Sequence, residues 1–167
     1  MGAKEDLEKI ALQERELRLP RLDAQVAWEL GSRIRALAVE RGHSLVIDVR
    51  RFGQPLFYSA LEGTTPNNTD WIRRKSNTVA KFLRSSYASG ILLKMKGANL
   101  AERYGLPVAD YAADGGSFPL AVEGAGVVGS VTVSGLSQRE DHNLVIEALC
   151  ALLGRDFAAV RLEPESE

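Results

Sequence analysis

Three segments in the first half of the chain carry apolar residues every three or four positions, which is the spacing of one helix face. Residues 4–17 keep this spacing up to Pro20, which predicts a short helix that docks onto the rest of the protein. Residues 22–41 keep it up to Gly42, a residue type that favours the left-handed end of a helix. A third, long helix is predicted to follow a polar stretch and to end before Gly90. Its expected buried stripe consists of Ile72, Val79, Phe82, Leu83 and Tyr87.

Two hairpins are indicated by β-branched segments on either side of a glycine-containing turn. The four strand segments are residues 44–51, 55–61, 118–123 and 127–134. A last long helix is predicted over residues 137–153, and residues 157–162 are expected to return as an edge strand. Residues 91–95 fit a strand or an apolar loop, and residues 99–104 fit a short helix. Because hairpin strands run antiparallel, we expect an α+β fold with an antiparallel sheet of about five strands and helices packed on it.

The composition is that of one ordinary globular domain. The chain has 167 residues, of which 45% are hydrophobic and 26% charged, and we expect one domain over residues 1–167 with a docking helix in 1–19 and a flexible tail in 163–167. Its 21 basic and 22 acidic residues give a net charge of -1. This balance provides no electrostatic reason to expect nucleic acid or a membrane surface as a partner.

Cysteine usage and the chain start both favour a cytoplasmic protein. Cys150 is the single cysteine and lies within an apolar run, so we expect an inert core thiol in a reducing compartment. The first residues lack the apolar stretch of a signal peptide, and no segment approaches a membrane span of ~18 apolar residues. With one cysteine and two histidines, no metal site made by the protein alone is expected.

The clearest local motif is a capping box in which Ser137 and Glu140 satisfy each other's backbone amides. It places Asp141 and His142 in the first turn of a helix, directly after the strand that ends at Ser134. There His142 can accept a proton, donate a hydrogen bond or bind a metal or haem iron, and Asp141 and His142 are the candidate catalytic residues. In the alternative interpretation, Asp141 complements the helix dipole and His142 fills a subunit or loop contact.

Two further segments are candidates for ligand binding. Residues 67–75 form a polar turn that runs into a helix, and Asp70, Trp71, Arg74 and Lys75 are its candidate ligand-binding residues. A polar stripe along one helix face, made of Arg73, Asn77, Lys81 and Arg84, can hold a carboxylate or phosphate, although such stripes are commonly solvated surface. The paired glycines Gly115 and Gly116 let the backbone approach a ligand or another chain closely, unless they form a purely structural turn. With Ser134, they complete the candidate set.

Three ordered motifs give the chain a family resemblance. They are residues 71–82, residues 115–119, and residues 129–136 together with Asp141 and His142. In these motifs, within residues 22–153, the chain resembles the haem-degrading domain proteins related to GlcG and HbpS. The resemblance implies a profilin-like α/β/α sandwich with a five-stranded antiparallel sheet. It also implies homo-oligomers and haem as the cofactor, with haem degradation as a further activity.

Three functions remain open from the sequence. The first is an oligomeric haem- or tetrapyrrole-binding protein with His142 beside Gly115 and Gly116. The second is a non-enzymatic assembly or small-metabolite-binding module, in which the first helix and Trp71 pack between subunits. The third is a small-anion enzyme that uses Arg73, Arg74 or Lys75 together with His142, which requires these groups to share one pocket.

Overall fold

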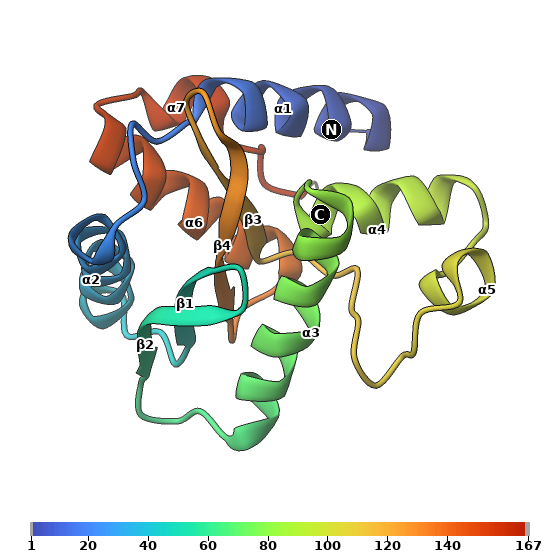
Figure 1. The fold of residues 1–167 in the computed structure, drawn as a ribbon, viewed down its shortest axis with the longest axis horizontal. Helices are drawn as coiled ribbons and strands as arrows, with labels where there is room; N and C mark the ends of the chain where they lie inside the picture. The colour runs from blue at the N-terminus through green and yellow to red at the C-terminus, as the bar shows by residue number, and fades with distance from the viewer. Residues whose placement is uncertain (1, 166–167) are drawn as a thin grey trace.

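The computed structural model describes residues 2–165, and its centre is a four-stranded antiparallel sheet with strand order β2-β1-β4-β3. The strands are β1 (Val46–Arg51), β2 (Gln54–Ala60), β3 (Ser117–Val122) and β4 (Gly126–Ser134). The helices are α1 (Ala3–Glu16), α2 (Ala24–Glu40), α3 (Pro66–Phe82), α4 (Ser86–Met95), α5 (Leu100–Tyr104), α6 (Gln138–Leu153) and α7 (Phe157–Val160). Figure 1 shows that α1 and α4 lie on the side of the sheet edge that β3 forms.

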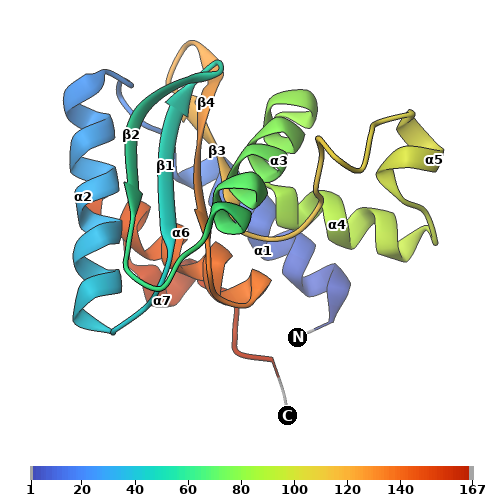
Figure 2. The same ribbon diagram turned by 90° about the horizontal axis from the view of Figure 1, so that it is seen from below.

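The sheet lies between two layers of helices. Helices α2 and α6 pack on one face, and α3 packs on the other, as Figure 2 shows edge-on for α2 and α3. The antiparallel sheet with flanking helices confirms the α+β fold class that the hairpins predicted. The expected five strands are wrong, because the sheet has four.

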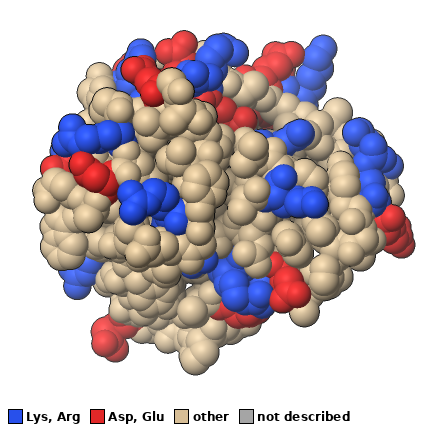
Figure 3. Space-filling view, viewed as in Figure 1, with Lys and Arg blue, Asp and Glu red and all other residues tan. Residues whose placement is uncertain are grey.

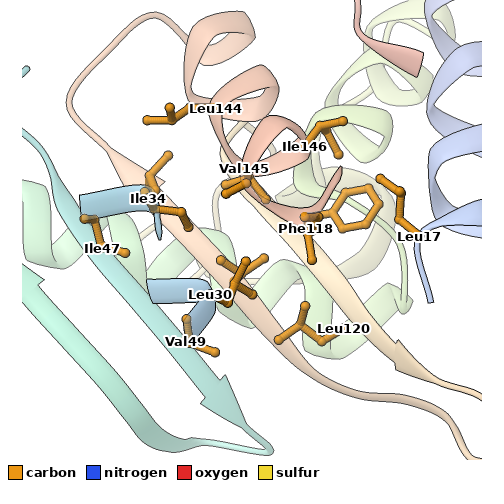
Figure 4. Close-up of a cluster of buried hydrophobic side chains, with 14 of the residues drawn as sticks. Leu17, Leu30, Ile34, Ile47, Val49, Phe118, Leu120, Leu144, Val145 and Ile146 are labelled. Carbon is orange, nitrogen blue, oxygen red and sulfur yellow. The ribbon is translucent and has the colours of Figure 1, made fainter. Parts of the chain in front are cut away.

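The face of the sheet under α2 and α6 is apolar. Successive residues of a strand point to opposite faces, so alternate positions of each strand reach this side. Their side chains interlock with those of the two helices in one buried cluster (Figure 4). Residues labelled there include Leu30, Ile34, Ile47, Val49, Phe118, Leu120, Val145 and Ile146. Cys150 belongs to the same cluster, as its apolar run predicted.

The face under α3 is polar for a protein interior. Ser117 and Thr132 share a hydroxyl hydrogen bond of 2.8 Å across β3 and β4, and both side chains are buried. Asp48 of β1 is fully buried and accepts two hydrogen bonds from Arg50, of 2.6 and 2.9 Å. Lys75 of α3 is buried on the same side. Lys75 donates to the carbonyl oxygen of Val133 in β4 at 2.7 Å, so a directional bond as well as packing holds α3 on this face.

The predicted edge strand at residues 157–162 is also wrong, which explains part of the missing fifth strand. Asp156 accepts a hydrogen bond from the backbone N–H of Ala158 and starts the short helix α7. The backbone N–H of Leu162 is then taken by the side chain of Asn143 at 3.0 Å. A backbone donor used by a side chain of α6 is lost to a sheet ladder.

The long helix predicted before Gly90 is two helices. Leu83 adopts a left-handed conformation with φ 58° and ends α3, and Ser85 accepts from the N–H of Ala88 at 3.1 Å to start α4. Leu83 is consequently exposed, so its predicted burial is wrong. Helix α4 continues to Met95, so neither a strand nor a loop forms over residues 91–95. A capping serine inside an apolar pattern was the signal for the break.

The two ends of the chain meet on the first turns of α6. Arg139 of α6 donates two hydrogen bonds to the carboxylate of Asp6 in α1, of 2.8 and 2.9 Å, and a third to the carbonyl oxygen of Glu163 at 2.6 Å. The predicted docking segment 1–19 contains α1, and its residue 1 lies outside the described residues. Residues 166 and 167 of the predicted tail lie outside them as well. Between residues 2 and 165, no helix has the length and apolar character needed to cross a membrane.

Candidate functional site

Helix α6 begins with the capping box that the sequence predicted. The hydroxyl of Ser137 accepts from the backbone N–H of Glu140 at 3.3 Å, and the Glu140 carboxylate accepts from the N–H of Ser137 at 3.1 Å. This arrangement fixes the first turn of the helix directly after β4. Asp141 and His142 follow in that turn, and their side chains point to different parts of the molecule.

Asp141 forms a buried ion pair with Lys75 of α3. The distance from Lys75 Nζ to Asp141 Oδ2 is 3.3 Å, and the two residues are only 3% and 2% exposed. The other carboxylate oxygen accepts from the backbone N–H of Leu136 at 3.0 Å. The pair therefore ties the start of α6 and the preceding loop to α3.

Lys75 also donates to two carbonyl oxygens, that of Gly115 at 3.0 Å and that of Val133 at 2.7 Å. An ammonium group has three protons, so these bonds and the one to Asp141 use all of them. Burial lowers the pKa of Lys75, and the nearby carboxylate of Asp141 opposes that shift. Burial raises the pKa of Asp141 to about 6, against the opposing effect of Lys75. Lys75 thus serves as a structural centre, and it has no free proton or lone pair for nucleophilic chemistry.

Gly115 and Gly116, which we call the glycine bend, lie directly before β3 and pack closely against the surroundings of Lys75. Gly116 has φ +129°, and a Cβ atom placed on it would lie 2.5 Å from Lys75 Nζ and 2.6 Å from the carbonyl oxygen of Val133. A Cβ atom on Gly115 would lie 2.3 Å from the carbonyl oxygen of Gln138. Both positions therefore require glycine for close approach of the backbone, and Gly116 requires it for its conformation as well.

An open cavity of about 310 Å³ lies where these segments meet, and we call it the β4–α6 cavity. It is bordered by the starts of α3 and α6, by the end of β4 and by the glycine bend. Its lining residues are Asn67, Asn68, Trp71, Lys75, Asp114, Gly115, Ser134, Gly135, Leu136, Gln138 and Asp141. The structure thus brings together five of the nine residues singled out in the sequence, namely Trp71, Lys75, Gly115, Ser134 and Asp141. Whether they bind a ligand stays a prediction.

Three of the other candidates lie beside this cavity without lining it. Asp70 forms an exposed ion pair with Arg73 at 3.0 Å, and Arg73 also pairs with Asp110 at 2.9 Å. Arg74 lies over the indole ring of Trp71, 4.5 Å from its centroid. Gly116 sits behind Lys75. Arg73, the first residue of the stripe, therefore holds the loop before β3 and does not line the cavity.

His142 lies in the core, away from the β4–α6 cavity. Its Nε2 atom is 2.8 Å from Oε1 of Gln13 in α1, and its ring is in contact with Tyr87 and Phe118 at centroid distances of 5.5 and 5.9 Å. Burial lowers the pKa of His142 to about 3, so the ring is neutral. Consecutive helix residues differ by about 100° in direction, which separates His142 from Asp141. The prediction that both act at one site, and that His142 shares a pocket with Arg73, Arg74 or Lys75, is not supported by this placement.

Several lining residues were missed or left unassigned in the sequence. A glutamine at position 138 does not by itself indicate a binding site. It lies three positions before Asp141, however, and hence on the same helix face. Its side-chain oxygen accepts from the backbone N–H of Gly115 at 3.1 Å, which joins the helix start to the glycine bend. Asp114 and Gly135 were flanking residues of recognised motifs. Proximity to a helix start was the signal that could have included them.

The residues of the β4–α6 cavity do not fit axial ligation of haem iron. Its lining includes no histidine, cysteine, methionine or tyrosine. Over the described residues, no group of three or more His, Cys, Asp or Glu side chains is placed to hold a metal ion. His43 lines a different cavity, with Glu140 and Glu147. Burial raises the pKa of Cys150 to about 11, which keeps that core thiol protonated. We therefore derive no iron chemistry at this cavity.

Comparison with known proteins places this architecture among characterised folds. A family model described as "Haem degrading protein HbpS-like" matches residues 22–150. A UPF0303 protein of Burkholderia thailandensis is 60% identical over 157 residues, which cover 94% of this chain and 95% of the relative. A UPF0303 protein of Burkholderia mallei is 59% identical over 157 residues, with the same coverage of 94% and 95%.

Solved structures share the fold. The crystal structure of the Ybr137w protein superposes with a TM-score of 0.82 at 27% identity, covering 92% of this chain and 94% of that one. The crystal structure of a PduOC:Heme complex superposes with a TM-score of 0.67 at 15% identity, covering 78% and 94%. The crystal structure of HbpS gives 0.65 at 20% identity, covering 83% and 94%. The resemblance seen in the sequence motifs is confirmed, and the chain belongs to the HbpS-like family of haem-degrading proteins.

Proposed function

We propose that this protein binds a planar organic molecule that carries a carboxylate, of the tetrapyrrole class, at the β4–α6 cavity, and holds it without a protein ligand to iron. The observation that carries the proposal is the position of Trp71 in the wall of a cavity bordered by two helix starts. The haem-degrading description of the family and the heme complex of PduOC support the ligand class.

The chemistry of the lining suits such a ligand. Arg74 covers one face of the Trp71 indole ring, so a conjugated ring system would stack on the opposite flat apolar face. The starts of α3 and α6 carry the positive ends of two helix dipoles, which favour a carboxylate. Asn67, Asn68 and Gln138 add neutral polar groups at the same rim. Lys75 and Asp141 neutralise each other, whereas the carboxylate of Asp114 in the same lining opposes an anionic group, so the helix starts have to supply the attraction.

The size of the cavity limits how much of the ligand it encloses. A volume of about 310 Å³ is at the lower end of the small-molecule pockets that bury most of a ligand. We therefore expect a tetrapyrrole to insert one edge, with its acidic groups toward the helix starts, and to leave the rest outside.

Tryptophan fluorescence tests this proposal directly, because the chain has only two tryptophans, Trp71 in the cavity wall and Trp28 on α2. In a Trp28→Phe variant, protoporphyrin IX and hemin are expected to quench the remaining Trp71 fluorescence in a saturable way, with comparable affinities for the two compounds. In the matched Trp71→Phe variant, Trp28 reports from the opposite helix layer and is expected to be quenched weakly.

The comparison of the two porphyrins separates this mode from iron ligation. Binding of hemin without binding of metal-free protoporphyrin IX contradicts the proposal, because it requires a protein ligand to iron. If that hemin binding is lost in His43→Ala, the ligand site is the other cavity, next to Glu140. Equal quenching of Trp28 and Trp71 also argues against the β4–α6 cavity.

We also propose that the protein forms homo-oligomers, as the family resemblance implied. The outer edge of β2 pairs with no other strand among residues 2–165, and Phe52 in the turn before it is 71% exposed. An exposed strand edge beside exposed aromatic residues is a common site of association between copies. Multi-angle light scattering is expected to give a multiple of the 18.2 kDa chain mass. A monomer at micromolar concentration rules the oligomer out.

A further inference from the structure

A second, smaller cavity lies at the other end of α3, and we call it the α4–α5 cavity. It encloses about 110 Å³ and is lined by Phe82, Arg84, Ser89, Leu92, Leu93, Lys96, Leu100, Arg103 and Tyr104. One wall is aromatic, because the rings of Phe82 and Tyr104 meet edge to face with centroids 4.8 Å apart. None of its residues belongs to the β4–α6 cavity.

Three cations line this cavity without a carboxylate among its walls. They are Arg84, Lys96 and Arg103, and none of them forms an ion pair with any residue of the described part of the chain. A hydrogen bond from Arg103, together with the positive charges of Arg103, Lys96 and Arg84, lowers the pKa of Tyr104 in the same cavity. In Figure 3, Lys and Arg side chains lie over the half of the face that α3, α4 and α5 form, as they do over the other half, and Asp and Glu side chains lie among them.

The buried hydroxyl group of Ser89 also lines the α4–α5 cavity. Ser89 is 6% exposed, and its Oγ atom has no hydrogen-bond partner among residues 2–165. A buried polar group without a partner costs free energy, so its presence calls for an explanation. Serine changes rotamer easily, and rotation about its Cα–Cβ bond turns the hydroxyl toward a group in the cavity. A bound anion would supply the missing acceptor.

We propose that the α4–α5 cavity binds the phosphate group of a small phosphorylated ligand. Phosphate carries a charge of about −1.5 to −2 near neutral pH, which matches three unpaired cations better than a single carboxylate does. Arg84 and Arg103 donate in the fork geometry that suits phosphate oxygens, Lys96 adds a point charge, and Ser89 donates from the wall. The rings of Phe82 and Tyr104 form the surface against which the organic part of the ligand packs.

The probes are inorganic phosphate and phenyl phosphate, titrated into the full-length protein by isothermal calorimetry. Both are expected to bind, and phenyl phosphate is expected to bind more tightly because its ring reaches the aromatic wall. If the two bind equally, the occupant is free phosphate and the apolar part of the proposal is wrong. Absence of saturable binding at millimolar concentrations of both probes overturns the proposal as a whole.

Variants separate a built site from general charge attraction. Arg103→Gln is expected to weaken binding of phenyl phosphate about tenfold, the equivalent of one charged hydrogen bond. Arg35→Gln removes the same charge from an exposed position on α2 and is expected to leave binding unchanged. Equal losses in both variants mean non-specific attraction and overturn the proposal.

The Ser89→Ala variant separates an effect on phosphate affinity from an effect on the stability of the protein. Removing an unpartnered hydroxyl is expected to leave the free protein as stable as before or more so, while affinity for phosphate falls several-fold. Unchanged affinity in this variant removes Ser89 from the site. Porphyrin quenching of Trp71 is measured at the other end of α3, so failure of either proposal is seen separately.

Discussion

His142 and Gln13 lie 129 residues apart in sequence, yet Nε2 of His142 is 2.8 Å from Oε1 of Gln13 in the core. The side-chain nitrogen of Gln13 donates to the carbonyl oxygen of Val160 at 2.6 Å, which fixes the orientation of the amide. Its oxygen therefore needs a donor, so the proton of the neutral His142 ring is on Nε2. The other ring nitrogen, Nδ1, has no partner within the described chain. This histidine joins α1 to α6.

The first prediction concerns the pH dependence of folding. The pKa of His142 is lowered from 6.5 to about 3 in the folded protein, so below about pH 6.5 the unfolded chain binds a proton that the folded protein does not. The unfolding free energy is therefore expected to fall as the pH decreases, by up to about 1.4 kcal/mol per pH unit from this group. Asp141, whose pKa is raised to about 6, contributes the opposite slope below that pH.

Comparison with His142→Gln isolates the histidine from Asp141. Urea denaturation of both proteins is measured from about pH 7 down to about pH 5, where an unperturbed histidine titrates. The advantage of the wild type over the variant is expected to shrink steadily with falling pH. A constant difference over this range means that His142 takes up protons equally in both states and contradicts the assignment.

The second prediction concerns the pair of Lys75 and Asp141. Lys75→Met leaves a buried carboxylate without its cation, and is expected to cost about 3–5 kcal/mol of unfolding free energy. Lys81→Met, the same change at an exposed position of α3, is expected to stay within about 0.5 kcal/mol. The double variant Lys75→Met/Asp141→Leu removes both charges, and its cost is expected to be smaller than the sum of the single costs. Strict additivity in chemical denaturation would mean that the two groups are not coupled.

The third prediction concerns the glycine bend. Gly116→Ala introduces a methyl group within 2.6 Å of a backbone oxygen at a φ of +129°. We expect a loss of at least about 2 kcal/mol, or a decrease in Tm of roughly 4–8 °C. Gly124 also has a positive φ, +79°, but its added Cβ meets nothing within 4 Å. Gly124→Ala is thus the matched control and is expected to show the smaller decrease in a thermal melt.

The fourth prediction concerns the docking of α1. Asp6→Asn weakens the bidentate contact with Arg139, whose two distances are 2.8 and 2.9 Å, and both residues are buried. Amide hydrogen exchange within α1 is expected to become faster, while exchange in α2 is unchanged, because local opening does not require global unfolding. Glu8→Gln, at an exposed position of the same helix, provides the control. Uniformly faster exchange across the whole chain would argue against a local role.

Much of this fold follows from short-range patterns in the sequence. The hairpins around Gly53 and residues 124–126 were predictable because the turn and the alternating strands lie next to each other in the chain. The capping box of Ser137 and Glu140 was predictable for the same reason. The break between α3 and α4 was missed because apolar spacing does not reveal the left-handed conformation of Leu83, and the local signal was the capping residue Ser85 instead.

The candidate site shows the same division. Sequence reasoning selected Trp71, Lys75 and Asp141 from their positions at two helix starts, and these residues do meet at one cavity. It grouped His142 with them because His142 directly follows Asp141 in the sequence. In the structure, Gln13, far away in sequence, holds the ring of His142 in the core. No local pattern reveals which side of a helix a distant helix will cover. The partner of a buried polar side chain is therefore the least predictable part of this site.

Helix α3, which Figure 1 shows as one continuous element, contributes its first half to the β4–α6 cavity and its last residue, Phe82, to the α4–α5 cavity. On α3 the first lining ends at Lys75 and the second includes Phe82, so about 10 Å of helix separates them at 1.5 Å per residue, and no residue lines both cavities. Because the two linings share no residue, coupling between the two sites would have to pass through α3, which the bond from Lys75 to the carbonyl oxygen of Val133 holds on the sheet. Titration of protoporphyrin IX in the presence of phenyl phosphate should consequently yield the same affinity as titration in its absence, and the reverse experiment should agree.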